Sequence, residues 1–146
     1  RLSPAGPIVI ELAARSIGGL CARTLRFALG GEADHALEEI VLRQALGLDL
    51  DAGAGPMRAA EAAGVMMLPI PQAGVLQDVD GVDEAKRVPL VEDVVLTIRP
   101  GEKLVPLPEG SSYPGFIFAR GAAPDLVEAA LREAHARLRF HVTPLL

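Results

Sequence analysis

The amino-acid sequence predicts an α+β fold in two parts, residues 1–50 and 57–146. Three observations support this prediction. First, a β-prone apolar run at residues 8–12 leads through a pair of glycines into helical patterns. Second, residues 49–56 are rich in Asp, Ala and Gly and end in Pro, which is typical of a linker. Third, the strands expected beyond this linker are short and cut by prolines, and a strongly patterned helix at 124–138 can cover the antiparallel sheet that they form.

The composition is that of a folded, acidic protein. Of the 146 residues, 50% are hydrophobic and 23% are charged, so the chain can bury a core and is not expected to be disordered. The net charge of −5 disfavours nucleic acid, and no basic patch with interleaved aromatic residues occurs. No apolar run approaches the ~18 residues of a membrane span. We therefore expect neither a nucleic-acid partner nor a membrane.

Two further features concern the setting of the chain. Cys21 is the single cysteine, which excludes a disulfide framework and a cysteine-based metal site, and we expect it to be a small buried hydrophobe. The chain does not begin with methionine, so we expect a piece of a longer protein. No positively charged leader precedes an apolar core, and a cytoplasmic location is the default expectation.

The first part is organised around the apolar run at residues 8–12, which reads as a strand buried on both faces. Side chains alternate along a strand, so Glu11 and Arg15 share one face. Gly18 and Gly19 let backbone approach a ligand closely, and a helix that begins beyond them would favour anions. An acid, a base and a bare backbone are thus expected at one strand end. The alternative is a structural ion pair followed by an ordinary strand-to-helix turn.

The string from Glu11 to Gly19 resembles the last conserved block of the ATP-grasp ligases, and it is most similar to the branch of L-amino acid ligases, biotin carboxylase and carbamoyl-phosphate synthase. The resemblance implies that Glu11 binds the magnesium on the phosphates of ATP. It implies that Arg15 holds the carboxylate substrate or its acyl-phosphate, and that Gly18 and Gly19 contact ATP through their backbone. Many members carry Asn, as an extra metal ligand or phosphate contact, at the position that is Ala13 here, so the implied metal site would depend more on other residues.

Two helices are expected after this string. The first covers residues 20–29, with Arg23 solvated. The second covers residues 34–46, where Asp34 is the expected N-cap and Gly47 the expected C-terminal stop. A strand, a glycine pair and two helices also resemble the end of an ATP-grasp domain.

The second part alternates short strands with helices. The expected helix at 124–138 has Pro124 at its first position. Residues 105–115 form the longest irregular stretch, of the kind that is often functional. Strands are expected at 62–70, 74–77, 91–98, 116–121 and 140–143, a helical turn at 82–88, and a buried helical stripe at Val127, Ala130, Leu131, Ala134 and Leu138.

The resemblance implies the C-terminal fragment of an ATP-dependent carboxylate–amine ligase that acts through an acyl-phosphate intermediate. Its cofactors would be ATP and Mg²⁺, and its partners a small-molecule carboxylate, a small-molecule amine and the N-terminal part of the same protein. Two alternatives stay open. One is a non-catalytic module for binding a small molecule or for dimerisation, and a homodimer is compatible with it. The other is a biotin-carboxylase-type subunit fragment, although no Met-Lys-Met attachment string occurs.

Overall fold

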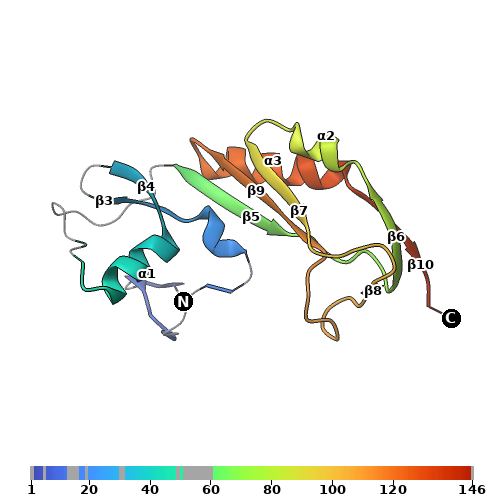
Figure 1. Cartoon of the computed structure of the whole chain (residues 1–146), viewed down its shortest axis with the longest axis horizontal. Helices are drawn as coiled ribbons and strands as arrows, with labels where there is room; N and C mark the ends of the chain where they lie inside the picture. The colour runs from blue at the N-terminus through green and yellow to red at the C-terminus, as the bar shows by residue number, and fades with distance from the viewer. Residues whose placement is uncertain are drawn as a thin grey trace.

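The structure, a computed structural model, describes residues 2–4, 6–12, 17–18, 20–29, 32–48, 50 and 61–145. In the described residues the fold is α+β, and every strand pairing is antiparallel, as the sequence predicts. Figure 1 shows the elements of the first part gathered at one end of the molecule and the pair β6 and β10 at the other. The predicted linker at 49–56 lies outside the described residues, apart from Leu50.

The first part contains short elements. They are β1 (Leu2–Ser3), β2 (Gly6–Pro7), the 3-10 turn η1 (Cys21–Thr24), β3 (Arg26–Leu29), β4 (Glu32–Ala36) and α1 (Leu37–Ala45). β1 pairs with β2, and β3 pairs with β4. Gly47 ends α1 with a φ of +68°, which confirms the predicted stop.

Three predictions for the first part are wrong. The helix expected at 20–29 is the turn η1 followed by β3, because pairing with β4 outweighs the local helical pattern. Asp34 lies within β4 and is not an N-cap, and α1 begins only after the extended residue Ala36. Residues 8–12 have no regular secondary structure, since no described strand pairs with them, and their apolar side chains are exposed, Val9 at 84%.

The second part is built on a three-stranded sheet in the order β5-β9-β7. These strands are β5 (Ala62–Met67), β9 (Gly115–Gly121) and β7 (Val91–Leu96). A second sheet, in the order β10-β6-β8, contains β10 (Arg139–Thr143), β6 (Gly74–Asp80) and β8 (Lys103–Leu104). The predicted strands are confirmed, with ends shifted by a few residues, and β8 is an addition that the sequence pattern does not indicate.

One face of the sheet β5-β9-β7 is covered by α3 (Pro124–Arg137), with α2 (Val82–Lys86) beside it (Figure 1). Pro124 stands at the start of α3, where a missing N–H costs nothing. Ile117 and Ala119 of β9 lie in this core, and Gly64 of β5 lets α3 approach, since a Cβ there would meet Val127 at 2.9 Å. All five residues of the predicted stripe are buried: Val127, Ala130, Leu131, Ala134 and Leu138.

The opposite face of the same sheet has a different cover. Phe116 and Phe118 alternate with the core residues of β9 and so point to this second face, yet Phe118 is only 2% exposed. Their rings stack on each other with centroids 6.3 Å apart, and the ring of Tyr113 contacts Phe116 edge-on. The turn η1 packs over β5 and β9 on this side. A segment of the first part therefore completes the packing of the second.

Candidate functional site

The structure places two of the four residues predicted for the site. Glu11 is exposed, in a stretch without regular structure. Gly18 is exposed at a bend, and a Cβ added to it would meet no atom within 4 Å. Arg15 and Gly19 lie outside the described residues. The arrangement of the four residues around a ligand therefore stays a prediction.

The helix expected to follow the glycines is a single 3-10 turn, η1, of four residues. A turn this short has too few aligned peptide dipoles to attract an anion appreciably, so the helix N-terminus predicted there is absent. The turn is closed by hydrogen bonds from the Arg23 N–H to the Leu20 carbonyl (3.1 Å) and from the Leu25 N–H to the Ala22 carbonyl (3.0 Å). η1 is therefore a hydrogen-bonded turn that begins three residues after Gly18, and not an anion site.

A cluster of mainly charged side chains, together with the Phe118 ring and the Thr24 backbone carbonyl, joins η1 to the sheet; we name it the η1 junction. Its members are Arg23 and Thr24 of η1, Lys86 of α2, Glu92 and Asp93 of β7, and Phe118 and Arg120 of β9. The Arg23 guanidinium lies 4.5 Å above the centroid of the Phe118 ring, a cation–π contact. Its Nη2 also donates to the Asp93 carboxylate at 3.3 Å. Arg23 is exposed, as predicted, with 49% of its side chain accessible, and it also anchors the turn through these two contacts.

Arg120 forms the second half of the η1 junction. Its Nε donates to Glu92 Oε1 at 2.8 Å, and its Nη2 donates to the backbone carbonyl of Thr24 at 3.1 Å. The Arg120 side chain is only 17% exposed, and its bond to the Thr24 carbonyl is partly shielded from water, whereas its bond to Glu92 is exposed. A guanidinium can make two such bonds in fixed directions at once, which an ammonium on a flexible stem cannot match.

The electrostatics of the junction favour the ionised form of Asp93. Burial by itself raises the pKa of this carboxyl. Hydrogen bonds from Arg23 and from the Val94 N–H, together with the charge of Lys86 at 3.5 Å, outweigh burial and lower the pKa below its ordinary value. Asp93 therefore stays negative at neutral pH and faces two cations, one from η1 and one from α2.

The sequence contains one signal for this cluster. Along β9 the residues Phe116, Phe118 and Arg120 alternate with residues of the α3 core, so they share the other face of the strand. Two aromatic rings and an arginine on a strand face indicate a partner on that face. What the sequence does not indicate is that the partner is η1, because 70 positions separate Arg23 from Asp93.

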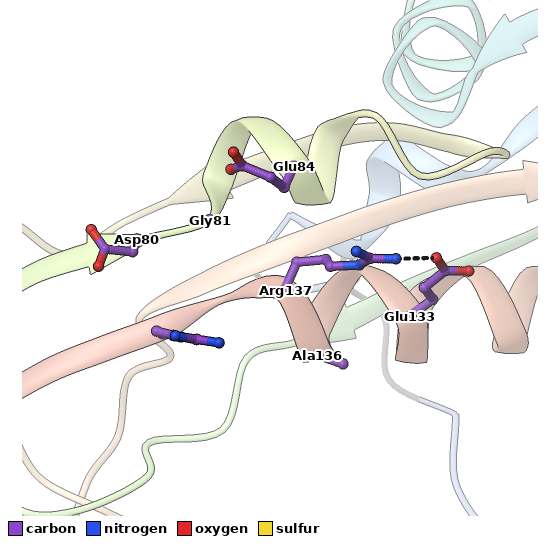
Figure 2. Close-up of a pocket in the computed structure, with 7 residues that line it drawn as sticks. Asp80, Gly81, Glu84, Glu133, Ala136 and Arg137 are labelled. Atoms are coloured by element: carbon purple, nitrogen blue, oxygen red, sulfur yellow. Dashed lines mark hydrogen bonds and ion pairs between the residues drawn. The ribbon is translucent and has the colours of Figure 1, made fainter.

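A second concave region lies between the start of α2 and the end of α3. It is an open groove of about 800 Å³ lined by Asp80, Gly81, Glu84, Glu133, Ala136, Arg137 and Arg139. Figure 2 shows Arg137 directed along α3 toward Glu133, its ion-pair partner at 2.8 Å. Asp80 is paired with His141 at 2.7 Å. The acidic and basic groups largely neutralise one another, which makes the groove a poor site for a strongly charged ligand.

Two absences hold for the described part of the chain. Within it, no group of three or more His, Cys, Asp or Glu side chains is placed to hold a metal ion. No helix in the described ranges is long and apolar enough to cross a bilayer.

Comparisons with known proteins identify relatives of the chain. A family model, described as L-amino acid ligase C-terminal domain 2, matches residues 66–143. Among solved structures, the crystal structure of L-amino acid ligase from Bacillus licheniformis matches with a TM-score of 0.64 and 30% sequence identity. That match covers 75% of this chain and 27% of the ligase, so the chain spans about a quarter of the length of that relative. A comparison with curated proteins gives no match.

Proposed function

Because this chain belongs to the family of L-amino acid ligase C-terminal domain 2, we propose that it is the C-terminal part of an ATP-dependent carboxylate–amine ligase. In the proposed reaction, ATP transfers its γ-phosphoryl group to a carboxylate oxygen, which gives an acyl-phosphate and ADP. An amine then attacks the acyl carbon, the C–O bond to phosphate breaks, and inorganic phosphate leaves.

The observation that carries this proposal is the extent of the structural match. Three quarters of the 146 residues is about 110, which is more than the 96 residues from 51 to 146, so the likeness to the Bacillus ligase includes residues of the first part. The first part contains the string with Glu11 and Gly18. The match therefore supports a common origin with a ligase for both parts of the chain.

Exposed apolar side chains give independent support for a larger protein around the first part. In water, a contiguous group of exposed apolar side chains is unfavourable and usually marks an interface. Most of the large apolar side chains that are exposed in the described residues fall in the first part: Ile8, Val9, Ile10, Leu12, Ile17, Val41, Leu42, Leu46 and Leu48. We propose that the rest of the ATP-binding domain covers them.

The proposed roles follow from side-chain chemistry. Magnesium prefers hard oxygen ligands and is commonly held by one or two carboxylates together with substrate phosphates, so the exposed carboxylate of Glu11 fits this use. The bound metal would neutralise charge on the phosphates. The planar fork of Arg15 would grip carboxylate or phosphoryl oxygens. The backbone of Gly18 and Gly19 would approach ATP, and positioning and charge neutralisation would supply most of the catalysis.

The proposal is tested in the full-length ligase by phosphate release across pairs of amino acids and other carboxylates. Glu11→Gln removes a hard ligand and should raise the magnesium concentration needed for half-maximal rate. Arg15→Lys should raise KM for the carboxylate by about 10-fold and leave the magnesium dependence unchanged. Gly18→Ala should lower activity without lowering the melting temperature, since the structure has open space at this position.

The matched control is Glu128→Gln, which removes a carboxylate from the exposed face of α3 and should change none of these quantities. Normal kinetics from less stable Glu11→Gln and Arg15→Lys variants would show that the two residues are a structural pair, and the proposed site would then be wrong.

A further inference from the structure

We propose that Arg23 and Arg120 are positioning residues for the ATP-binding glycine stretch. Together they hold η1 on the outer face of the sheet β5-β9-β7 and so restrict where the backbone at Gly18 lies relative to the second part. This inference rests on the proposed function, because it takes the two glycines as the backbone that contacts ATP.

The short connection between the glycines and η1 makes this control direct. Gly18 is three residues before Cys21, the first residue of η1, and consecutive Cα atoms are 3.8 Å apart. The backbone at Gly18 therefore cannot move more than roughly 11 Å from the start of a fixed η1. The turn itself is stiffened internally, because the Thr24 hydroxyl donates to the Cys21 carbonyl at 2.9 Å.

Several contacts of different kinds dock η1. Ala22 of η1 is buried, and Arg23 of η1 lies over the Phe118 ring. Arg120 of β9 donates a hydrogen bond to the Thr24 carbonyl. The bond from Arg120 ends on a backbone atom of η1, so it holds the main chain of the turn whatever side chains the turn carries. Glu92 orients the guanidinium from the neighbouring strand.

An ordinary surface ion pair in the same structure differs from the Arg120 contact with η1 in exposure and in the elements that it joins. Arg132 pairs with Glu128 one turn earlier in α3, both side chains are mostly exposed, and the pair joins no second element. Such pairs contribute little to stability. The bond from Arg120 to the Thr24 carbonyl is partly shielded and joins two residues 96 positions apart.

Docking of η1 and binding of ATP are then linked. If only the docked state presents the glycines correctly, the apparent affinity for ATP falls with the docked fraction. By reciprocity, bound ATP must favour the docked state by the same factor. Saturating ATP should restore the turnover number, because the bound state is the docked state.

The test uses the full-length ligase with Arg120→Gln and Arg120→Lys, and Arg132→Gln as the matched control. Docking is followed at Cys21, which lies half-buried in η1, by the rate of alkylation with iodoacetamide measured through peptide mass spectrometry. For a docked fraction near one tenth, we expect KM for MgATP to rise by about 10-fold with kcat changed less than about 2-fold. Cys21 alkylation should accelerate several-fold, and MgATP should slow it again.

The outcomes separate this inference from the proposed function. Unchanged Cys21 alkylation in Arg120→Gln, or faster alkylation with unchanged KM for MgATP, would overturn the positioning role. A fall in kcat alone would also overturn it, since loss of folded enzyme produces that pattern. The proposed function fails on a different result, namely full activity of Glu11→Gln with Arg120 intact.

A salt titration of the unmodified enzyme serves if Arg120→Gln does not fold. Ion pairs are screened as ionic strength rises. Alkylation of Cys21 that accelerates between low and high salt, with KM for MgATP rising in parallel, supports the inference. Alkylation independent of salt in both the unmodified enzyme and Arg120→Lys overturns it.

Discussion

The role of Arg23 depends on residues that contact it in space and not on residues near it in the sequence. Its local pattern is helical and places it on a solvated face. In the structure it contacts Phe118 and Asp93, both far along the sequence. Local periodicity contains no information on such partners, which is why the sequence predicts the buried stripe of α3 but misses the η1 junction.

At Asp93 the structure predicts a dependence on pH. The pKa of Asp93 is lowered in the folded protein, so its ionised form contributes stability above the ordinary pKa of about 3.9 and loses that contribution as pH falls through the lowered value. Asp93→Asn should therefore reduce the free energy of unfolding at pH 7 by about 1 kcal/mol or less. The charged groups that face Asp93 are Arg23 and Lys86.

The measurement is thermal unfolding of Asp93→Asn and the unmodified protein at several pH values. The difference in melting temperature should be present at pH 7 and should shrink steadily below about pH 4. A difference that is the same at all pH values would show that the carboxylate charge plays no part.

A helix or strand can be predicted from the sequence when its own residues contain the signals for it, and not when it depends on a partner far along the chain. α3 has Pro124 at its start, an apolar stripe at helical spacing, and ion pairs such as Glu133–Arg137 on its exposed face, and the sequence predicts it almost to the residue. β3 has no comparable pattern and exists because β4 pairs with it. β8 is two residues long and likewise depends on its partner β6.

The junction between β6 and α2 gives a prediction at this scale. Gly81 has a φ of +83°, and a Cβ there would lie 1.9 Å from the Arg137 carbonyl oxygen at the end of α3. Gly101 has a similar φ of +90°, but a Cβ there would meet nothing within 4 Å. Gly101→Ala should therefore cost only the backbone strain, about 1–2 kcal/mol. Gly81→Ala should cost clearly more, because α2 and α3 must also separate.

Urea unfolding of the two variants compares these costs directly. Equal losses of stability would mean that α3 and the β6–α2 turn are not packed as closely as the structure shows.

For the whole molecule, the two parts differ in how they bury apolar surface. The buried apolar side chains of the described residues lie almost entirely beyond residue 61, with Ala22 and Ile40 as the exceptions. The sequence predicts the α+β arrangement beyond residue 61 well, because α2 and α3 cover one face of the sheet β5-β9-β7. It predicts a buried strand at residues 8–12 where the structure has exposed chain, since burial of that run requires a partner that the described residues do not supply.

This asymmetry leads to a prediction about ligand binding. The 146-residue chain alone should bind MgATP weakly or not at all, because it offers one proposed metal carboxylate, Glu11, and no adenine-binding segment. Titration calorimetry with the 146-residue chain, and with the full-length protein as the positive control, measures this. Micromolar binding of MgATP to the 146-residue chain alone would contradict the proposed division of the site.

The central place of β9 has a consequence for how the protein is made. A ribosome releases β5 and β7 before β9, yet both strands pair with β9 and not with each other. One edge of β6 similarly lacks its partner until β10, the last strand described, has been synthesised. During synthesis the emerging chain therefore carries strands whose hydrogen-bonding edges are open, and such edges are the usual starting points of aggregation. Nascent β5, with its Val65-Met66-Met67 run, is the segment that a chaperone would have most reason to hold until β9 emerges.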